Sequence, residues 1–169
     1  MLILLDIDGV LVPANSWKKP EFMEDGFPMF SSRSVKALQR ILTETNASVL
    51  LTTSHKSKYK VAEWKVMLNS RGINPKRVRR LTSNSLKTSR KDEILHWYTK
   101  KRVSNEEFVI IDDDKMLNGL PENIKHNLVL TSSSVGLTDD LADQAISIYK
   151  KQVIFKLSLI SVQNAAGAV

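Results

Sequence analysis

The chain has 169 residues, of which 42% are hydrophobic and 25% charged, a balance typical of one globular domain with a buried core. It contains no cysteine, which excludes disulfides, thiolate zinc sites and cysteine nucleophiles. No apolar run approaches a membrane span, and the first run ends at Asp6, too early for a signal peptide. We therefore expect a cytoplasmic protein without a membrane segment.

Five short apolar runs end at polar residues, which is typical of buried parallel strands. Their ranges are 2–5, 48–51, 78–81, 108–111 and 128–130. Segments with apolar residues at helical spacing lie between and after them, at 33–45, 58–70, 90–101 and 138–150. Gly72 is suited to end the second helix, and Ser89 or Thr88 to cap the third.

Strands that alternate with helices predict an α/β fold. We expect a three-layer, Rossmann-like domain over residues 1–151, with a central, mainly parallel five-stranded sheet and helices on both faces. Residues 152–169 would form a C-terminal tail or an added strand, because they begin Gln-Val-Ile-Phe-Lys-Leu-Ser-Leu-Ile. A dimer contact or a frayed end are the other interpretations of this tail, and the oligomeric state is not indicated.

Carboxylates follow two of the predicted strands. Asp6 and Asp8 come after the first, and Asp112 and Asp113 after the fourth. Because carboxyl ends of parallel strands meet at one edge, where ligands bind, we expect these residues to converge. Such carboxylates would repel each other without a cation, and oxygen ligands without cysteine or a histidine cluster favour Mg²⁺.

A cation would allow phosphoryl chemistry at this edge. One Asp could attack phosphorus, and a second Asp two residues later could move the proton of the leaving oxygen and of water. A hydroxyl at a neighbouring strand end and a basic side chain would hold the phosphoryl oxygens. Thr52 or Thr53 offers the hydroxyl, and Lys91 at the start of a helix offers the charge.

The order Asp-x-Asp, hydroxyl, basic residue, Asp-Asp resembles the haloacid dehalogenase (HAD) superfamily of phosphohydrolases over residues 1 to about 150. The matching segments are Asp6–Leu11, Leu50–Ser54 and Ile110–Asp114, with Lys91 at the basic position and Arg90 or Lys87 as the other choices. Ordinary strand-end hydrogen bonding could equally explain the two threonines, and an exposed helix charge could explain Lys91.

The resemblance implies a role for each residue. Asp6 would be the nucleophile and a Mg²⁺ ligand, and Asp8 the general acid/base that also lends its backbone carbonyl to the metal. Phosphate binding would fall to Thr52 or Thr53 and to Lys91 or Arg90. Metal binding would be completed by Asp113, with Asp112 beside it.

The motifs together, with Arg90 to Trp97, look like the HAD domains of Swiss Army Knife RNA repair proteins. That group is expected to carry an aromatic residue and an arginine after the hydroxyl motif, where this chain has His55 and Lys56. Caps of the superfamily are inserted at two points. Here Val12–Ser32 has room only for a loop or flap with Trp17, Phe22 and Phe27, and Lys56–Leu86 only for a helix and a strand.

The net charge of +7 is unevenly distributed. Lys56 to Arg102 holds 15 Lys or Arg against 3 Asp or Glu, a net of +12. Solvated helix faces would explain this run, as would a field that attracts nucleic acid. We predict an uncapped, Mg²⁺-dependent phosphatase that acts through an aspartyl-phosphate, with nucleic-acid phosphate ends as substrate. The alternatives are a phosphatase of phosphoproteins or small metabolites, and a catalytically idle domain that binds nucleic acid or a partner.

Overall fold

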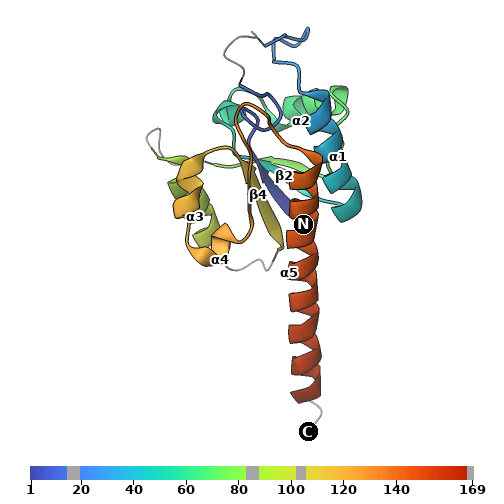
Figure 1. Cartoon of the computed structure of the whole chain (residues 1–169), viewed down its shortest axis with the longest axis vertical. Coiled ribbons are helices and arrows are strands. Elements are labelled where there is room, and N and C mark those ends of the chain that lie inside the picture. Colours follow the sequence, from blue (N-terminus) through green and yellow to red (C-terminus); the bar gives the residue numbers. More distant parts are fainter. Residues whose placement is uncertain (15–19, 83–87, 102–105, 167–169) are drawn as a thin grey trace.

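Five parallel strands form one sheet at the centre of the molecule, in the order β3-β2-β1-β4-β5. The computed structural model describes residues 1–14, 20–82, 88–101 and 106–166. The strands span Leu2–Leu5 (β1), Ser48–Leu51 (β2), Val78–Arg80 (β3), Phe108–Asp112 (β4) and Leu128–Leu130 (β5). The predicted five-stranded parallel sheet is therefore confirmed (Figure 1).

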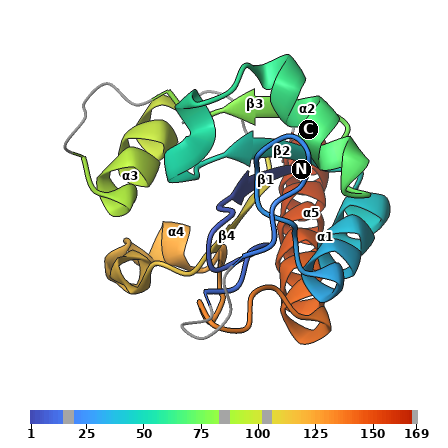
Figure 2. The same cartoon turned by 90° about the horizontal axis from the view of Figure 1, so that it is seen from above.

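Helices cover both faces of the sheet, as predicted (Figure 2). The α-helices span Ser32–Thr45 (α1), Val61–Ser70 (α2), Arg90–Lys101 (α3), Glu122–Lys125 (α4) and Asp139–Ala166 (α5), and two 3₁₀ turns span Ser54–Ser57 (η1) and Lys115–Gly119 (η2). Alternate strand residues divide the core: Ile3 and Leu5 pack with α1, α2 and α5, whereas Leu2 and Leu4 pack with α3 and α4.

The sheet changes direction between β1 and β4. From β1 the chain moves outward through β2 to the edge strand β3, then returns to β4 on the other side of β1. Residues that follow β1 and β4 therefore flank the switch point, where α/β sheets bind ligands. Asp6 follows β1 directly and donates its backbone N–H to the Ile111 carbonyl (3.0 Å). Its side chain therefore lies at the carboxyl end of β1, beside the end of β4.

Local signals explain the helix ends. Gly72 has φ +79° and donates its N–H to the Asn69 carbonyl, which ends α2 as predicted. The Ser89 hydroxyl accepts from the Asp92 N–H (3.1 Å) and donates to the Asp92 carboxylate (2.6 Å), so Ser89 caps α3. The cap determines where α3 begins, and thus where Arg90 and Lys91 lie relative to the strand ends.

The prediction that residues 152–169 form an added strand is wrong for the part that the structure describes. Residues 152–166 continue α5, which runs for 28 residues without a break. The apolar run from Val153 to Ile160 cannot be distinguished as strand or helix by its period, and no Gly or Pro interrupts the chain between Thr138 and Gly167. The expected boundary at residue 151/152 therefore lies inside a helix.

The segment between β1 and α1 holds a short hairpin among its described residues. Phe22 and Pro28 form its bridge, and Met23 accepts the N–H of Gly26, where φ is +69°. Arg71 at the end of α2 holds the hairpin through a bidentate bond to Asp25 (2.6 and 2.8 Å). The described part of the chain shows no separate cap domain, and Trp17 lies outside it.

None of the described helices combines the length and the apolar character needed to cross a membrane.

Candidate active site

The turn after β1 is closely packed around Gly9. Ile7 is fully buried, and its carbonyl accepts the N–H groups of Val10, Leu11 and Val12. Gly9 has φ +70°, and a Cβ atom there would lie 2.1 Å from Asp113 Oδ2. Glycine is therefore required twice, by the backbone conformation and by the approach of the β4 carboxylate. The Asp-x-Asp-Gly turn and the Asp-Asp pair are thereby brought into contact.

Asp6, Asp112 and Asp113 form one acidic cluster. Each contributes a carboxylate oxygen, and these oxygens all lie within 4.8 Å of one another. Asp6 and Asp112 are buried, with 5% and 1% of their surface exposed, while Asp113 is half-buried. The convergence predicted from the strand ends is thus present for three of the four carboxylates.

Burial and mutual repulsion perturb the cluster. The pKa of Asp6 is raised to about 7, chiefly by burial and then by the charge of Asp112, while Arg90 opposes the shift. The pKa of Asp112 is also raised, mainly by burial. Burial and mutual repulsion oppose the ionisation of both carboxylates at once. A bound cation would remove this opposition, so the raised pKa values are those expected of residues that bind a cation.

The donor set fits a hard divalent cation. Asp112 Oδ1 accepts the Asp114 N–H (3.0 Å), but Asp112 Oδ2 is buried and has no hydrogen-bond partner. A buried carboxylate oxygen left in this state costs free energy that a metal–oxygen bond would recover. Asp6, Asp112 and Asp113 are the residues that could hold such an ion.

Arg90, rather than Lys91, reaches the acidic cluster. Its Nη2 lies 3.2 Å from Asp6 Oδ1 and its Nε 3.5 Å from Asp112 Oδ2, while its Nη1 is buried without a partner. Lys91 points toward Gly119 of η2: a Cβ built on Gly119 would lie 3.1 Å from Lys91 Nζ. Lys87, the third choice, lies outside the described residues. Geometry therefore favours Arg90, the less expected choice, at the basic position.

The two threonines after β2 differ in their hydrogen bonds. Thr53 Oγ1 accepts the His55 N–H (3.3 Å) and caps η1, which is the ordinary strand-end role left open above. Thr52 is fully buried, and its Oγ1 has no partner. Its backbone N–H bonds to the Leu5 carbonyl (2.9 Å), which places it beside the end of β1. Of the two hydroxyls, that of Thr52 is the one left without a hydrogen-bond partner.

Asp8 lies outside the acidic cluster, with about half of its side chain (53%) exposed. Its Oδ2 lies 3.0 Å from Nε2 of His55, whose ring contacts the buried Phe27 edge-on at 5.5 Å. The sequence pattern did not predict this contact, because in the sequence His55 is only a departure from the expected motif. The only available signal was its position, three residues after a strand end that also carries the candidate hydroxyl.

Lys56 links the turn after β2 to α3. Its Nζ is buried against the Glu93 carboxylate at 3.0 and 3.2 Å, and its carbonyl accepts the Trp64 Nε1–H (3.3 Å). Because Glu93 lies one turn after Arg90, this ion pair ties the first turn of α3 to the strand ends. His55 and Lys56, where the sequence departs from the expected pattern, thus contact Asp8 and α3 respectively.

Comparisons with known proteins agree with this geometry. A model of the HAD domain in Swiss Army Knife RNA repair proteins matches residues 2–142, which is most of the chain and includes every candidate site residue described above. Neither the comparison with curated proteins nor that with solved structures gave a match.

Proposed function

The chain belongs to the family of HAD domains found in Swiss Army Knife RNA repair proteins, and on that premise we propose that it is a Mg²⁺-dependent phosphohydrolase. One observation carries the proposal: the buried Asp6 carboxylate, at the switch point of the sheet, lies among Asp112, Asp113 and Arg90. A carboxylate that only stabilised the fold would not need two further carboxylates within 4.8 Å.

In the proposed reaction, an Asp6 oxygen attacks phosphorus and the bond to the leaving oxygen breaks. Asp8, in its protonated form, gives its proton to that oxygen, and Asp6 carries the phosphoryl group as an aspartyl-phosphate. Asp8 then takes a proton from water, whose oxygen attacks phosphorus and releases phosphate and the Asp6 carboxylate. When bound, Mg²⁺ would neutralise phosphoryl oxygens and keep Asp6 ionised.

Arg90 and Thr52 would hold the phosphoryl oxygens during both steps. Each has a buried polar atom without a partner, the Nη1 of Arg90 and the Oγ1 of Thr52. An oxygen that binds both would satisfy donors that are otherwise left unpaired, and such donors are strongest as the charge on the phosphoryl group develops. The close contact of His55 Nε2 with Asp8 Oδ2 (3.0 Å) would keep Asp8 directed toward the leaving oxygen.

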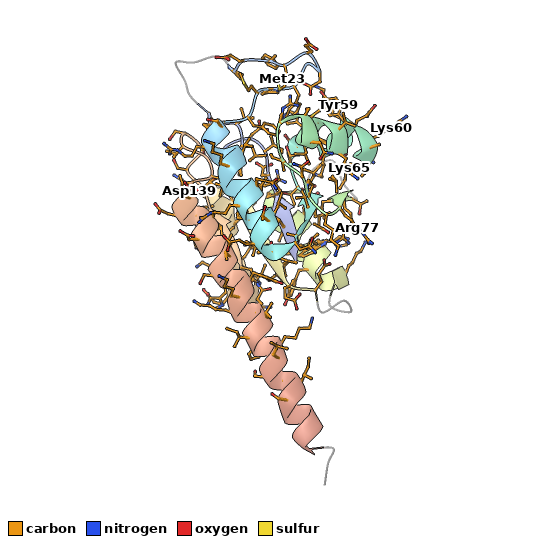
Figure 3. The ribbon with its side chains drawn as sticks, turned by 90° about the vertical axis from the view of Figure 1, so that its right-hand side faces the viewer. Met23, Tyr59, Lys60, Lys65, Arg77 and Asp139 are labelled. Atoms are coloured by element: carbon orange, nitrogen blue, oxygen red, sulfur yellow. The ribbon has the colours of Figure 1, made fainter. Side chains whose placement is uncertain are left out.

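We further propose a phosphorylated nucleic-acid end as the substrate. Some basic residues of the 56–102 segment serve the fold, since Lys56 and Arg71 are buried in ion pairs. Others are exposed, and Figure 3 shows Lys60, Lys65 and Arg77 along one side of the molecule that leads toward the carboxyl edge of the sheet. A polyanion could follow this side to a site that no cap closes.

Hydrolysis of an aryl phosphate by wild type and by Asp6→Asn, each with Mg²⁺ or EDTA, tests the reaction. We expect Mg²⁺-dependent turnover in the wild type and none in the variant, with circular dichroism unchanged. Equal activity of both proteins would refute the nucleophile assignment, and an inactive wild type would favour the idle binding domain.

A substrate panel tests the second part of the proposal. DNA and RNA with 3′- or 5′-phosphates, nucleotides, sugar phosphates and phosphopeptides would be compared at two salt concentrations. The proposal predicts the highest kcat/KM for phosphorylated oligonucleotides, with a loss at high salt that free nucleotides do not show. Preference for a small phosphate or a phosphopeptide would assign the alternative phosphatase class.

A further inference from the structure

Helix α5 extends well beyond the rest of the molecule. Its first half packs against α1 and the sheet, and Gln152 clamps it to the start of β4 by bonds to both backbone groups of Phe108 (2.8 and 3.0 Å). Lys156 pairs with Glu107 at 2.7 Å, and after this pair the helix extends away from the body (Figure 1). We call residues 153–166, from the Gln152 clamp onward, the projecting segment, whose first turn is still tied to the body by Lys156.

The projecting segment exposes apolar side chains on all sides. Ile154, Phe155 and Leu157 are 60–66% exposed, and Leu159 and Ile160 about half. At 100° per residue, Phe155 and Leu159 lie on one side, and Leu157 and Ile160 on the opposite side. A helix that is apolar all round is normally buried, so residues 154–160 mark an interaction surface.

A groove lies at the foot of the projecting segment. It measures about 940 Å³, and its walls are α5, with Phe155 and Leu159, and the opposing side chains of Tyr98, Asn123 and His126. One side of the projecting segment therefore continues directly into the groove. A second helix placed there would have one side against α5 and its other side against α3 and α4.

We propose that the occupant is the projecting segment of a second copy, in an antiparallel two-fold pair. The segment and the groove lie on the same end of the same chain, so a two-fold axis across the helix brings each segment into the groove of its partner. From Gln152 to Ala166 the helix rises about 21 Å, so full overlap puts the axis near Leu159.

Part of the exposed apolar area would be buried in such a pair. Phe155 and Leu159 on the groove side, with Ile160 in the half that enters the partner's groove, present about 300 Å² per copy, taking roughly 180 Å² for each side chain if fully exposed. Two segments then contribute about 600 Å², and the walls of the two grooves would supply the rest of the roughly 1,200 Å² that stable interfaces bury. The carboxyl edge of the sheet lies at the opposite end of the molecule, so the pairing leaves both candidate active sites open.

Light scattering after gel filtration tests the pairing. We expect twice the chain mass of 19.1 kDa at micromolar concentration, and a dissociation constant raised roughly 100-fold in Phe155→Glu and in Ile160→Glu. Val66→Glu, at an equally exposed apolar residue on α2 (68%), is the matched control and should stay dimeric. Phosphatase activity and circular dichroism should be unchanged in all three.

Crosslinking tests the register. The chain has no cysteine, so Ser158→Cys should join two copies under oxidation, whereas Ser70→Cys on α2 should not. A monomeric wild type, or a dimer that both Glu variants leave intact, would overturn the proposal. A monomer that binds anionic lipid vesicles through the projecting segment would assign a lipid surface as the occupant instead. A dimer without the Ser158→Cys crosslink would refute the antiparallel register.

Discussion

Replacing Asp6 by Asn should stabilise the protein in the absence of metal. The native pKa of Asp6 is about 7, against 3.8 for the free side chain. The native state therefore binds more protons than the unfolded state between these values, and the free energy of unfolding falls as pH rises through this window. At 1.36 kcal/mol per pKa unit, ionising Asp6 costs the fold about 4 kcal/mol once the pH exceeds 7.

Asparagine removes this cost but also weakens the bond to Arg90, whose Nη2 lies 3.2 Å from Asp6. We therefore expect a net gain of about 2–3 kcal/mol at pH 8, or roughly 5–10 °C in the midpoint of thermal unfolding. The gain should shrink progressively as the pH falls from about 7 toward 3.8, because the native wild type keeps Asp6 protonated in this window while the unfolded chain takes up its proton only near 3.8.

Urea unfolding in EDTA at pH 5 and pH 8 measures this difference. Asp140→Asn, an exposed carboxylate in the first turn of α5, is the matched control and should not stabilise at either pH. Mg²⁺ should then stabilise the wild type at pH 8 and have less effect on Asp6→Asn. A variant no more stable than the wild type at pH 8, or a gain independent of pH, would refute the electrostatic account of the cluster.

Three further changes probe neighbouring residues. Thr52→Val should leave the free energy of unfolding unchanged or raise it by about 1 kcal/mol, because it removes an unpaired buried hydroxyl. The value of kcat/KM should fall about 10–100-fold. A loss of stability without a loss of activity would contradict this prediction. His55→Phe should reduce hydrolysis of alkyl phosphates about tenfold more than that of aryl phosphates, since only alkyl leaving groups depend strongly on the Asp8 proton; equal losses would argue against a positioning role. Gly9→Ala should displace Asp113 and weaken Mg²⁺ binding at least tenfold by calorimetry, and unchanged affinity would remove Asp113 from the metal site.

The sheet could be predicted from the sequence because its strands are short apolar runs buried on both faces. The predicted strand at 48–51 matches β2, which ends where the apolar run meets a polar residue. The predicted helix at 90–101 matches α3, which Ser89 caps. Periodicity failed at residues 153–160, where apolar side chains at nearly every position fit a strand or a helix. The absence of Gly and Pro between Thr138 and Gly167 was the better indication that the helix continues.

The site was predictable as a set of strand ends, because parallel topology alone brings them together. The direction in which each side chain points could not be predicted in this way. Arg90 and Lys91 are adjacent in sequence, yet about 100° apart around α3, so only the position of the helix decides which one meets Asp6. The His55–Asp8 contact likewise depends on η1, a turn that no sequence pattern indicated.

The most direct test of the central claim is whether Asp6 itself becomes phosphorylated. The wild type, mixed with Mg²⁺ and a phosphorylated substrate and quenched in acid within one turnover, would be digested and mapped by mass spectrometry. The account predicts one phosphoryl group on the peptide that carries Asp6. This adduct should be absent in Asp6→Asn, and it should not form in the wild type when EDTA is present. Substrate turnover with no adduct at Asp6, or an adduct on another residue that persists in Asp6→Asn, would contradict it.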